Sequence, residues 1–230
     1  MQNVGAYGQE AADTIESVRA FDLRAPGLRE DRIVVLPKPA CGFRYRSSIF
    51  NTTERGRYVI LRVNYRLKRG GAPSLKYADL QRHFAGCKTP PSLAETREAV
   101  RGIRRSKGML LVPGDQDCRS AGSFFKNPVL SPEQFKDLSA RAAAKGLEIP
   151  NYPALDAQHK VSAAWLVEHS GFPKGYTLGA AGISQKHALA LINRGEAKAS
   201  DIVALKEKIQ RAAHEDWGIQ LEEEPVFVGF

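Results

Sequence analysis

The spacing of apolar residues in the first third of the chain predicts β-strands. Between Tyr58 and Leu67, apolar side chains occupy every second position, and basic or amide side chains stand between them. This period of two is typical of a strand with one buried face. The apolar face would carry Leu61, Val63, Tyr65 and Leu67, and the polar face Arg62, Asn64 and Arg66. The segment 31–38 predicts a second strand, shorter and more buried.

From Ser92 onward, the apolar spacing changes to that of helices, most of which begin at a serine and end at a glycine. In the first of them Ser92 is the expected N-cap, Glu95 completes a capping box, and Gly108 ends the helix. Its basic residues stand near the C-terminal end, where the helix dipole favours cations. Further helices are predicted at 131–146, 161–171 and 184–195, and a last one begins at Ser200.

The final residues return to a composition typical of strands. The predicted fold class is therefore α+β, in three parts. These are a β-rich part over 1–107, an α+β part over 108–218, and a terminal strand over 219–230 that folds back onto the first part. The absence of an internal repeat excludes a solenoid.

The composition narrows the class of protein. No apolar run approaches the ~20 residues needed to cross a bilayer, and the start lacks the segments of a signal peptide, so we expect a cytoplasmic protein. Three cysteines and five histidines without metal-ligand spacing predict reduced thiols and no metal site. The net charge of +9 over 230 residues predicts an anionic partner, which can be nucleic acid, an acidic membrane or a phosphorylated small molecule.

Two stretches in the first part combine reactive side chains with irregular backbone. In QNVGAYGQE, the small residues Gly5, Ala6 and Gly8 would let a cofactor lie close to the main chain. In CGFRYRSS, Arg46 follows Tyr45, and an arginine can grip a carboxylate or phosphate through two parallel hydrogen bonds. Taken alone, a tight turn and a salt bridge at a strand edge are the simpler interpretations.

Two more stretches stand in the second half of the chain. GSFFKNP places the hydroxyl of Ser123 near the charge of Lys126 and the amide of Asn127. No GxSxG motif surrounds Ser123, so a hydrolase triad is poorly supported and proton donation is the alternative role. LEEEPVFVG carries three successive carboxylates, Glu222–Glu224. Taken alone, a loop and an acidic surface run are the simpler interpretations.

In chain order, the stretches QNVGAYGQE, CGFRYRSSIF, AGSFFKNPVLS, KVSAAWLVEHSGFPKGYTLGAAGISQKHALALINRG and LEEEPVFVG resemble the UDP-N-acetylenolpyruvoylglucosamine reductase family, also called UDP-N-acetylmuramate dehydrogenase. The resemblance implies a step of peptidoglycan synthesis in the cytoplasm. NADPH would reduce FAD, and a hydride would then pass to UDP-N-acetylglucosamine enolpyruvate, giving UDP-N-acetylmuramate. It also implies an incomplete FAD-binding domain of the PCMH type, followed by a substrate-binding domain.

The same resemblance assigns roles to individual residues. Ser123 matches the serine that protonates the substrate after hydride transfer, and Arg46 and Glu224 match the pair that stabilises the enolic intermediate. Lys107 matches a lysine for the substrate diphosphate, and Tyr77 a tyrosine on a loop that closes over the uridine nucleotide. The remaining substrate-binding matches are Tyr45, Asn127 and His187, and the FAD-contacting matches are Gly5, Ala6, Tyr7, Gly8 and Gln9.

The sequence departs from the family pattern at its start. Family members carry a further N-terminal portion, with a glycine-rich segment for the FAD diphosphate, ahead of the motif that here begins at Gln2. We therefore expect either a fragment or a misassigned start, with an incomplete FAD site and exposed apolar surface.

Two other classes of function remain in view. One is a sugar-nucleotide-binding fragment that holds no flavin and has no redox activity. The other is a nucleic-acid-binding protein, which the charge favours but which lacks a helix-turn-helix, zinc or RNP-type motif. We expect neither nucleic acid nor membrane as a partner.

Overall fold

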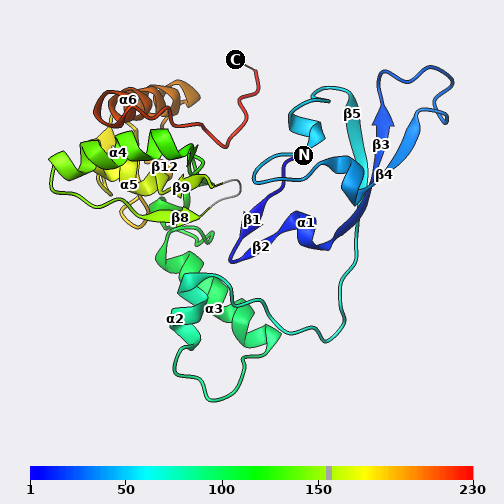
Figure 1. The fold of residues 1–230 in the computed structure, drawn as a ribbon, viewed down its shortest axis with the longest axis horizontal. Helices are drawn as coiled ribbons and strands as arrows, with labels where there is room; N and C mark the ends of the chain where they lie inside the picture. The colour runs from blue at the N-terminus through cyan, green and yellow to red at the C-terminus, as the bar shows by residue number, and fades with distance from the viewer. Residues whose placement is uncertain (154–156, 230) are drawn as a thin grey trace. The chain divides into compact units, whose positions relative to one another are not determined.

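The computed structural model describes residues 1–153 and 157–229 (Figure 1). The chain divides into two compact units, Met1–Val100 and Arg101–Phe230, and each is described by itself. The boundary lies inside the helix α3 (Leu93–Ser106), whereas the sequence placed it after Lys107. Several small sheets with helices around them make both units mixed α and β, in agreement with the predicted class.

The first unit contains an antiparallel sheet of three strands in the order β4-β3-β5. Its inner face carries Val18 of β3, which lies opposite Leu36 of β4 and Val63 of β5. Buried Cys41 and Phe50 pack in the same apolar cluster. The strands are β3 (Ile15–Asp22), β4 (Ile33–Pro37) and β5 (Tyr58–Tyr65), so both predicted strands exist.

The predicted apolar face of β5 is wrong except at Val63. Ala20 lies opposite Ile60 while the preceding Arg19 lies opposite Arg62, so Leu61 is the extra residue of a β-bulge. The bulge shifts the phase of the alternation, and the residues that pack toward the core are Tyr58, Ile60 and Val63. Leu61, Tyr65 and Leu67 are exposed. β4 is also less buried than expected, because Val35 is 61% exposed.

The rest of the first unit consists of short elements around this sheet. A hairpin of two short strands leads into a single helical turn, and two 3-10 turns follow β4. These are β1 (Gly5–Ala6), β2 (Gln9–Glu10), α1 (Ala11–Thr14), η1 (Lys38–Cys41) and η2 (Ile49–Asn51). The helix α2 (Ala78–Phe84) precedes α3.

The start and end of α3 confirm the sequence signals. The Ser92 amide donates to the Glu95 carboxylate at 2.7 Å, and the Glu95 amide donates to Ser92 Oγ at 3.2 Å. This is the predicted capping box. Gly108 follows the helix with φ of +65°, a conformation that glycine adopts without strain.

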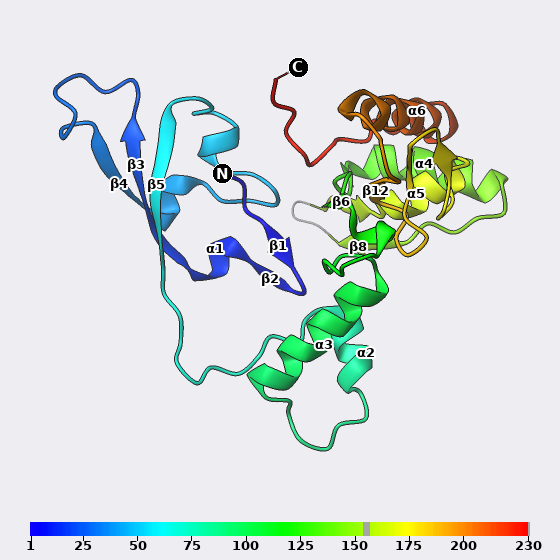
Figure 2. The ribbon, with the colours of Figure 1, turned by 180° about the vertical axis from the view of Figure 1, so that it is seen from behind.

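In its described residues, the second unit contains two small sheets with helices packed on them (Figures 1 and 2). One sheet has the order β10-β11-β12-β6, with β6 (Ser120–Ser123), β10 (Thr177–Leu178), β11 (Ala181–Ile183) and β12 (Ala190–Asn193). The other has the order β7-β9-β8, with β7 (Val129–Leu130), β8 (Asn151–Pro153) and β9 (His159–Val161). A 3-10 turn, η3 (Gln116–Cys118), precedes β6.

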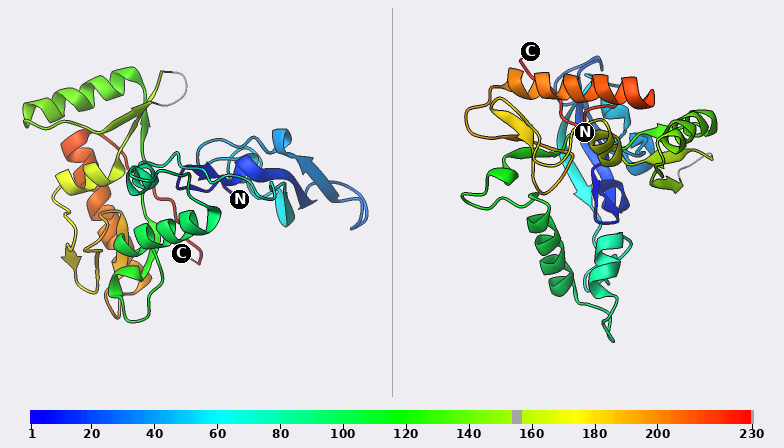
Figure 3. Two further views of the ribbon diagram at one scale, coloured as in Figure 1. Left: turned by 90° about the horizontal axis from the view of Figure 1, so that it is seen from below. Right: turned by 90° about the vertical axis from the view of Figure 1, so that its left-hand side faces the viewer.

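The helices of the second unit cover these sheets. They are α4 (Pro132–Ala144), α5 (Ala163–His169) and α6 (Ala199–Trp217). α6 packs on β11, β12, α4 and α5 (Figure 3), and buries Leu205, Ile209 and Trp217 in one apolar core. The predicted start of α4 at Ser131 is confirmed by a capping box with Gln134. Ser200 lies inside α6, which begins at Ala199 and not at a serine cap.

The predicted helix at 184–195 is wrong. That segment holds a turn followed by the strand β12. Every residue from Ala188 to Ile192 is buried, so the apolar run is covered on both faces. A short run of this kind is compatible with a buried strand and with a buried helix, and periodicity alone does not separate them.

The predicted terminal strand is also corrected. Among described residues 219–229, only an isolated β-bridge between Glu223 and Phe125 forms. It is flanked by two hydrogen bonds, from the Lys126 amide to the Glu222 carbonyl at 2.9 Å and from the Glu224 amide to the Phe124 carbonyl at 2.8 Å. These contacts lie within the second unit, and a return of the terminal segment to the first part stays a prediction. In the described part of the chain, no helix is long and apolar enough to span a membrane.

Candidate functional site

The predicted cofactor residues Gly5–Gln9 form the β1–β2 hairpin of the first unit. Ala6 lies opposite Gln9, and the two residues between them, Tyr7 and Gly8, have φ of +54° and +81°. Two consecutive left-handed residues are the geometry of a tight hairpin turn. Ala6, Gly8 and Gln9 are exposed.

The space that the two glycines open is filled by the chain itself. A Cβ at Gly5 would lie 2.9 Å from Glu10 Cγ and 3.2 Å from Arg46 Nη1. A Cβ at Gly8 would lie 2.9 Å from Lys76 Cβ and 3.0 Å from the Tyr77 amide nitrogen. On the side where a Cβ would stand, both glycines therefore admit neighbouring protein segments, and the contact of this hairpin with a cofactor stays a prediction.

Arg46 is held against this hairpin. Its Nη2 donates to the Gly5 carbonyl at 2.9 Å, and its guanidinium lies 5.2 Å from the centre of the Tyr45 ring. Its backbone has φ of +52°, which is uncommon for a residue with a side chain and often marks a functional position. The structure therefore brings together Gly5, Tyr45 and Arg46.

Tyr77, from a later segment of the chain, packs against the tip of the same hairpin. Its ring meets the Tyr7 ring edge to face, with centres 5.2 Å apart and planes at 69°. Tyr77 is also the N-cap residue of α2. A residue predicted to contact substrate and a residue predicted to contact FAD are thus direct neighbours.

In the second unit, Ser123 ends the strand β6 opposite Ala190 of β12. The two aromatics after it, Phe124 and Phe125, are buried in the core with their rings edge to face. They fix the strand end, and Ser123 stays only partly buried. Among the residues that the structure describes, no hydrogen bond to the Ser123 hydroxyl is found. The Ser123 hydroxyl therefore donates its proton to none of the described residues.

The other polar residues of GSFFKNP hold the local structure. Lys126 Nζ lies 3.1 Å from the carboxylate of Glu222. Asn127 Oδ1 accepts from the Ala163 amide at 2.9 Å, which ties the loop to the start of α5. The side-chain NH2 group of Asn127 is the part that can contact a substrate.

Glu224 lies on the segment that pairs with this loop. Its amide donates to the carbonyl of Phe124, the residue after Ser123. Of its two acidic neighbours, Glu222 contacts Lys126, and Glu223 accepts from Gln210 of α6 at 3.1 Å. The structure therefore brings Ser123 and Glu224 onto neighbouring segments. Arg46 belongs to the first unit, and its convergence with these two residues stays a prediction.

Two lysines act electrostatically on His187. Burial, together with the positive charges of Lys107 and Lys174, lowers the pKa of His187 from 6.5 to about 4. Its Nδ1 accepts from the Leu189 amide at 3.0 Å, so near pH 7 the ring is neutral and carries its hydrogen on Nε2. The charge of Lys107 thus acts on His187, and both are predicted substrate residues. Lys174 lies in one of the stretches that carry the resemblance, but the sequence analysis assigned it no role.

An acidic loop contacts the turn that carries His187. Lys186 Nζ donates to Asp115 Oδ2 at 2.6 Å, which lowers the pKa of Asp115 and raises that of Lys186. Asp117 accepts from the Gln185 amide at 2.8 Å. These two bonds attach η3 and its N-cap residue to the turn that carries His187. Within 1–153 and 157–229, no three side chains of the metal-ligating types gather in one place.

Comparison with known proteins gives consistent matches along the chain. Residues 113–228 match the family described as UDP-N-acetylenolpyruvoylglucosamine reductase, C-terminal domain. A protein of Thermobifida fusca named UDP-N-acetylenolpyruvoylglucosamine reductase is 46% identical, over 100% of this chain and 64% of its own length. A protein of the same name from Streptomyces coelicolor is 44% identical, over 100% of this chain and 60% of its own length. The chain thus spans less than two thirds of these relatives.

A solved structure is also similar. The crystal structure of UDP-N-acetylenolpyruvylglucosamine reductase from Thermus caldophilus superposes with a TM-score of 0.53 at 24% identity. The match covers 97% of this chain and 56% of that chain. At this identity the likeness concerns the fold alone.

Proposed function

Because the chain belongs to the UDP-N-acetylenolpyruvoylglucosamine reductase family, we propose that it acts in the NADPH- and FAD-dependent reduction of UDP-N-acetylglucosamine enolpyruvate to UDP-N-acetylmuramate. This reaction is a cytoplasmic step of peptidoglycan synthesis. The observation that carries the proposal is the pairing of the Ser123 loop with the Glu224 segment, through the bond from the Glu224 amide to the Phe124 carbonyl. Two predicted catalytic residues that are distant in sequence thereby become neighbours.

Ser123 is the proposed proton donor. The bound flavin would supply a hydride to one carbon of the enolpyruvyl double bond, and the neighbouring carbon then needs a proton. A serine hydroxyl is a weak acid, so it acts only toward a strongly basic acceptor in a fixed geometry. An enolate is such an acceptor. The buried Phe124 and Phe125 supply the fixed geometry by anchoring the end of β6.

Arg46 and Glu224 are the proposed stabilisers of the enolic intermediate. Negative charge grows on the carboxyl end of the substrate as the hydride arrives, and a preset cation lowers the free energy of that state. Arg46 Nη2 donates to the Gly5 carbonyl, and the guanidinium geometry suits a carboxylate. Tyr45 stays beside the guanidinium and supports its orientation.

The β1–β2 hairpin suits the ring system of a flavin better than its diphosphate. Ala6, Gly8 and Gln9 are exposed, and a two-stranded hairpin has a row of backbone polar groups on each outer edge. Such edges can hydrogen-bond a planar heterocycle. The motif itself contains no lysine or arginine and opens no long helix, the features that hold a diphosphate.

The cations that act on His187 support a phosphate-bearing substrate. Lys107 and Lys174 provide charge, and neutral His187 provides one directed Nε2–H donor. A histidine that stays neutral adds a hydrogen bond without a third charge to desolvate. We propose that this group, with Tyr77 and Asn127, holds the uridine diphosphate part of the substrate.

The test is reconstitution of the purified chain with FAD. Yellow protein whose colour NADPH bleaches, and UDP-N-acetylglucosamine enolpyruvate restores, is the expected result. Ser123→Ala should leave the bleaching by NADPH unchanged and slow the recolouring ~10²–10⁴-fold, the usual contribution of a general acid. A chain that stays colourless in excess FAD contradicts the proposal.

Ser120→Ala is the matched control for this experiment. Ser120 stands on the same strand, and its hydroxyl accepts from the Gly122 amide at 3.2 Å, so it is already engaged within the protein. Recolouring should be nearly normal in this variant. If both serine variants slow recolouring equally, the effect is structural and Ser123 is not the proton donor.

A further inference from the structure

The tip of the β1–β2 hairpin is packed against the segment that leads into α2. Gly8 allows this approach, because a Cβ there would lie 2.9 Å from Lys76 Cβ and 3.0 Å from the Tyr77 amide nitrogen. Distances below 3.0 Å essentially never occur for real Cβ atoms, so a side chain at Gly8 would push Lys76 Cβ away and press on the Tyr77 amide.

The neighbouring residue of the turn makes the second contact. Tyr7, held at φ of +54°, presents its ring to Tyr77 at a centre distance of 5.2 Å and an angle of 69°. Edge-to-face geometry of this kind is attractive beyond the burial of area alone. Two contacts therefore join the turn to this segment. The Gly8 backbone lies close to Lys76 and Tyr77, and the Tyr7 ring packs on the Tyr77 ring.

The backbone that leads to Tyr77 on its N-terminal side is irregular. The residues 66–77 form no helix or strand, and Gly70 and Gly71 lie among them. On the C-terminal side, α2 is anchored by Leu80, which is 1% exposed. Tyr77 stands where this irregular segment meets the anchored helix, and its side chain is 36% exposed. Its position thus depends on what lies against it.

We propose that Tyr7 and Gly8 are positioning residues for Tyr77: the turn of the hairpin is the seat that holds the Tyr77 segment in place. The inference rests on the proposed function, in which the hairpin contacts the flavin and Tyr77 contacts the uridine nucleotide. The two binding events then share one contact. A change at the hairpin tip weakens nucleotide binding although the tip itself does not touch the nucleotide.

The first experiment tests the seat without reference to function. Gly8→Ala and Gly56→Ala are compared by hydrogen exchange in the full chain. Both glycines have similar positive φ, +81° and +78°, but a Cβ at Gly56 would meet nothing within 4 Å. Both variants therefore carry the same backbone strain, and only Gly8→Ala disturbs the seat. Exchange in peptides covering 72–82 should rise several-fold in Gly8→Ala and stay unchanged in Gly56→Ala. Equal exchange in the two variants would overturn the proposal.

The second experiment measures binding of UDP by calorimetry. Tyr7→Ala should weaken binding ~3–10-fold, as expected for loss of one aromatic pair, and Tyr7→Phe, which keeps the ring, should restore it. In a chain that already carries Tyr77→Ala, the same change at Tyr7 should have no further effect. If Tyr7→Ala reduces the affinity for UDP equally with and without Tyr77, the proposed coupling between Tyr7 and Tyr77 is refuted. If the unaltered chain does not bind UDP, the proposed function fails, and hydrogen exchange still decides whether the seat exists.

Discussion

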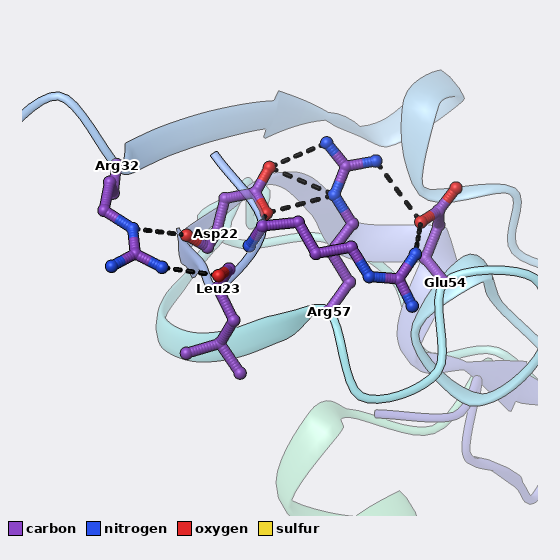
Figure 4. A network of polar contacts seen from close by, with 6 residues as sticks. Asp22, Leu23, Arg32, Glu54 and Arg57 are labelled. Atoms are coloured by element: carbon purple, nitrogen blue, oxygen red, sulfur yellow. Dashed lines mark hydrogen bonds and ion pairs between the residues drawn. The ribbon is translucent and has the colours of Figure 1, made fainter. Parts of the chain in front are cut away.

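Among the described residues, the apolar core of the first unit contains four buried side chains, whereas that of the second unit contains twenty. The first unit compensates with charge at one end of its sheet (Figure 4). There Arg57 donates to both carboxylate oxygens of Asp22, at 3.0 and 2.7 Å, and contacts Glu54 at 3.3 Å. Arg32 adds bonds to the carbonyls of Asp22 and Leu23. The two units of this chain are therefore stabilised by different forces.

This difference predicts that the stability of the two units depends on different conditions. Burial of apolar surface depends little on pH or salt, whereas ion pairs depend on both. The Asp22 carboxylate is buried at 4% exposure and Arg57 is partly exposed at 32%, so the pair is only partly screened by solvent. The first unit should respond to acid and salt, and the second to loss of packing volume.

The largest expected effect is a cavity in the second unit. Leu205→Ala removes a fully buried side chain of α6, and should reduce the free energy of unfolding by about 3 kcal/mol. Urea denaturation measures this change, and hydrogen exchange resolved by unit shows where it acts. The control is Leu111→Ala, at a position 85% exposed, which should change stability little. Equal losses from both variants would contradict the packed core.

His187 introduces one pH-dependent element into the second unit. Its pKa is about 4 in the folded state and near 6.5 when unfolded, so the unfolded state binds more protons between these values. The stability of the second unit should be complete above about pH 6.5 and should fall as the pH drops toward about 4. His187→Gln should flatten this slope in urea denaturation while the first unit's pH profile stays unchanged. An unaltered slope would mean that another group causes it.

The Asp22–Arg57 ion pair of the first unit should lose its stabilising effect at a lower pH than His187. Hydrogen bonds from Arg57 lower the pKa of Asp22 from 3.8 to about 2. A lowered carboxyl pKa stabilises the fold above about pH 4, and this contribution is lost as the pH falls from about 4 to about 2. Hydrogen exchange in β3 and β5 should rise over that range. Asp22→Asn should raise hydrogen exchange in β3 and β5 already at pH 7 and remove its dependence on acid. If exchange in this variant still rises as the pH falls, other groups cause the acid response.

The smallest expected effect concerns a helix cap. Ser131→Ala removes the hydroxyl that accepts from the Gln134 amide, and should cost about 1 kcal/mol in thermal unfolding of the second unit. Ser139→Ala, in the interior of the same helix, is the control and should be neutral or slightly stabilising. A smaller loss at Ser131 than at Ser139 would show that the capping box does not stabilise α4.

Local signals were the part of the fold that the sequence predicted well. The pairs Ser92–Glu95 and Ser131–Gln134 satisfy the first amides of their own helices, so a few consecutive residues contain the whole interaction. β12 was missed because its apolar residues are buried on both sides. The bulge at Leu61 was missed because it depends on the register against β3, which spacing within one strand does not contain.

In the candidate site, too, some features were predicted from the sequence and others are seen only in the structure. The resemblance supplied Ser123 and Glu224, and the structure added the hydrogen bond that makes their segments neighbours. The contacts of Gly5 with Arg46 and of Tyr7 with Tyr77 were outside the reach of sequence reasoning. They join residues far apart in the chain, and glycine offers no side chain from which a partner can be guessed.

The narrow sheet of the first unit has a practical consequence. Within the part of the chain that the structure describes, β4 has a strand neighbour only in β3, and it carries Val35 at 61% exposure and no charged side chain between Ile33 and Pro37. An open, uncharged edge is a template onto which the edge of another copy can add. Concentrated samples should therefore aggregate through β4, and a lysine in place of Val35 is the simplest way to improve solubility.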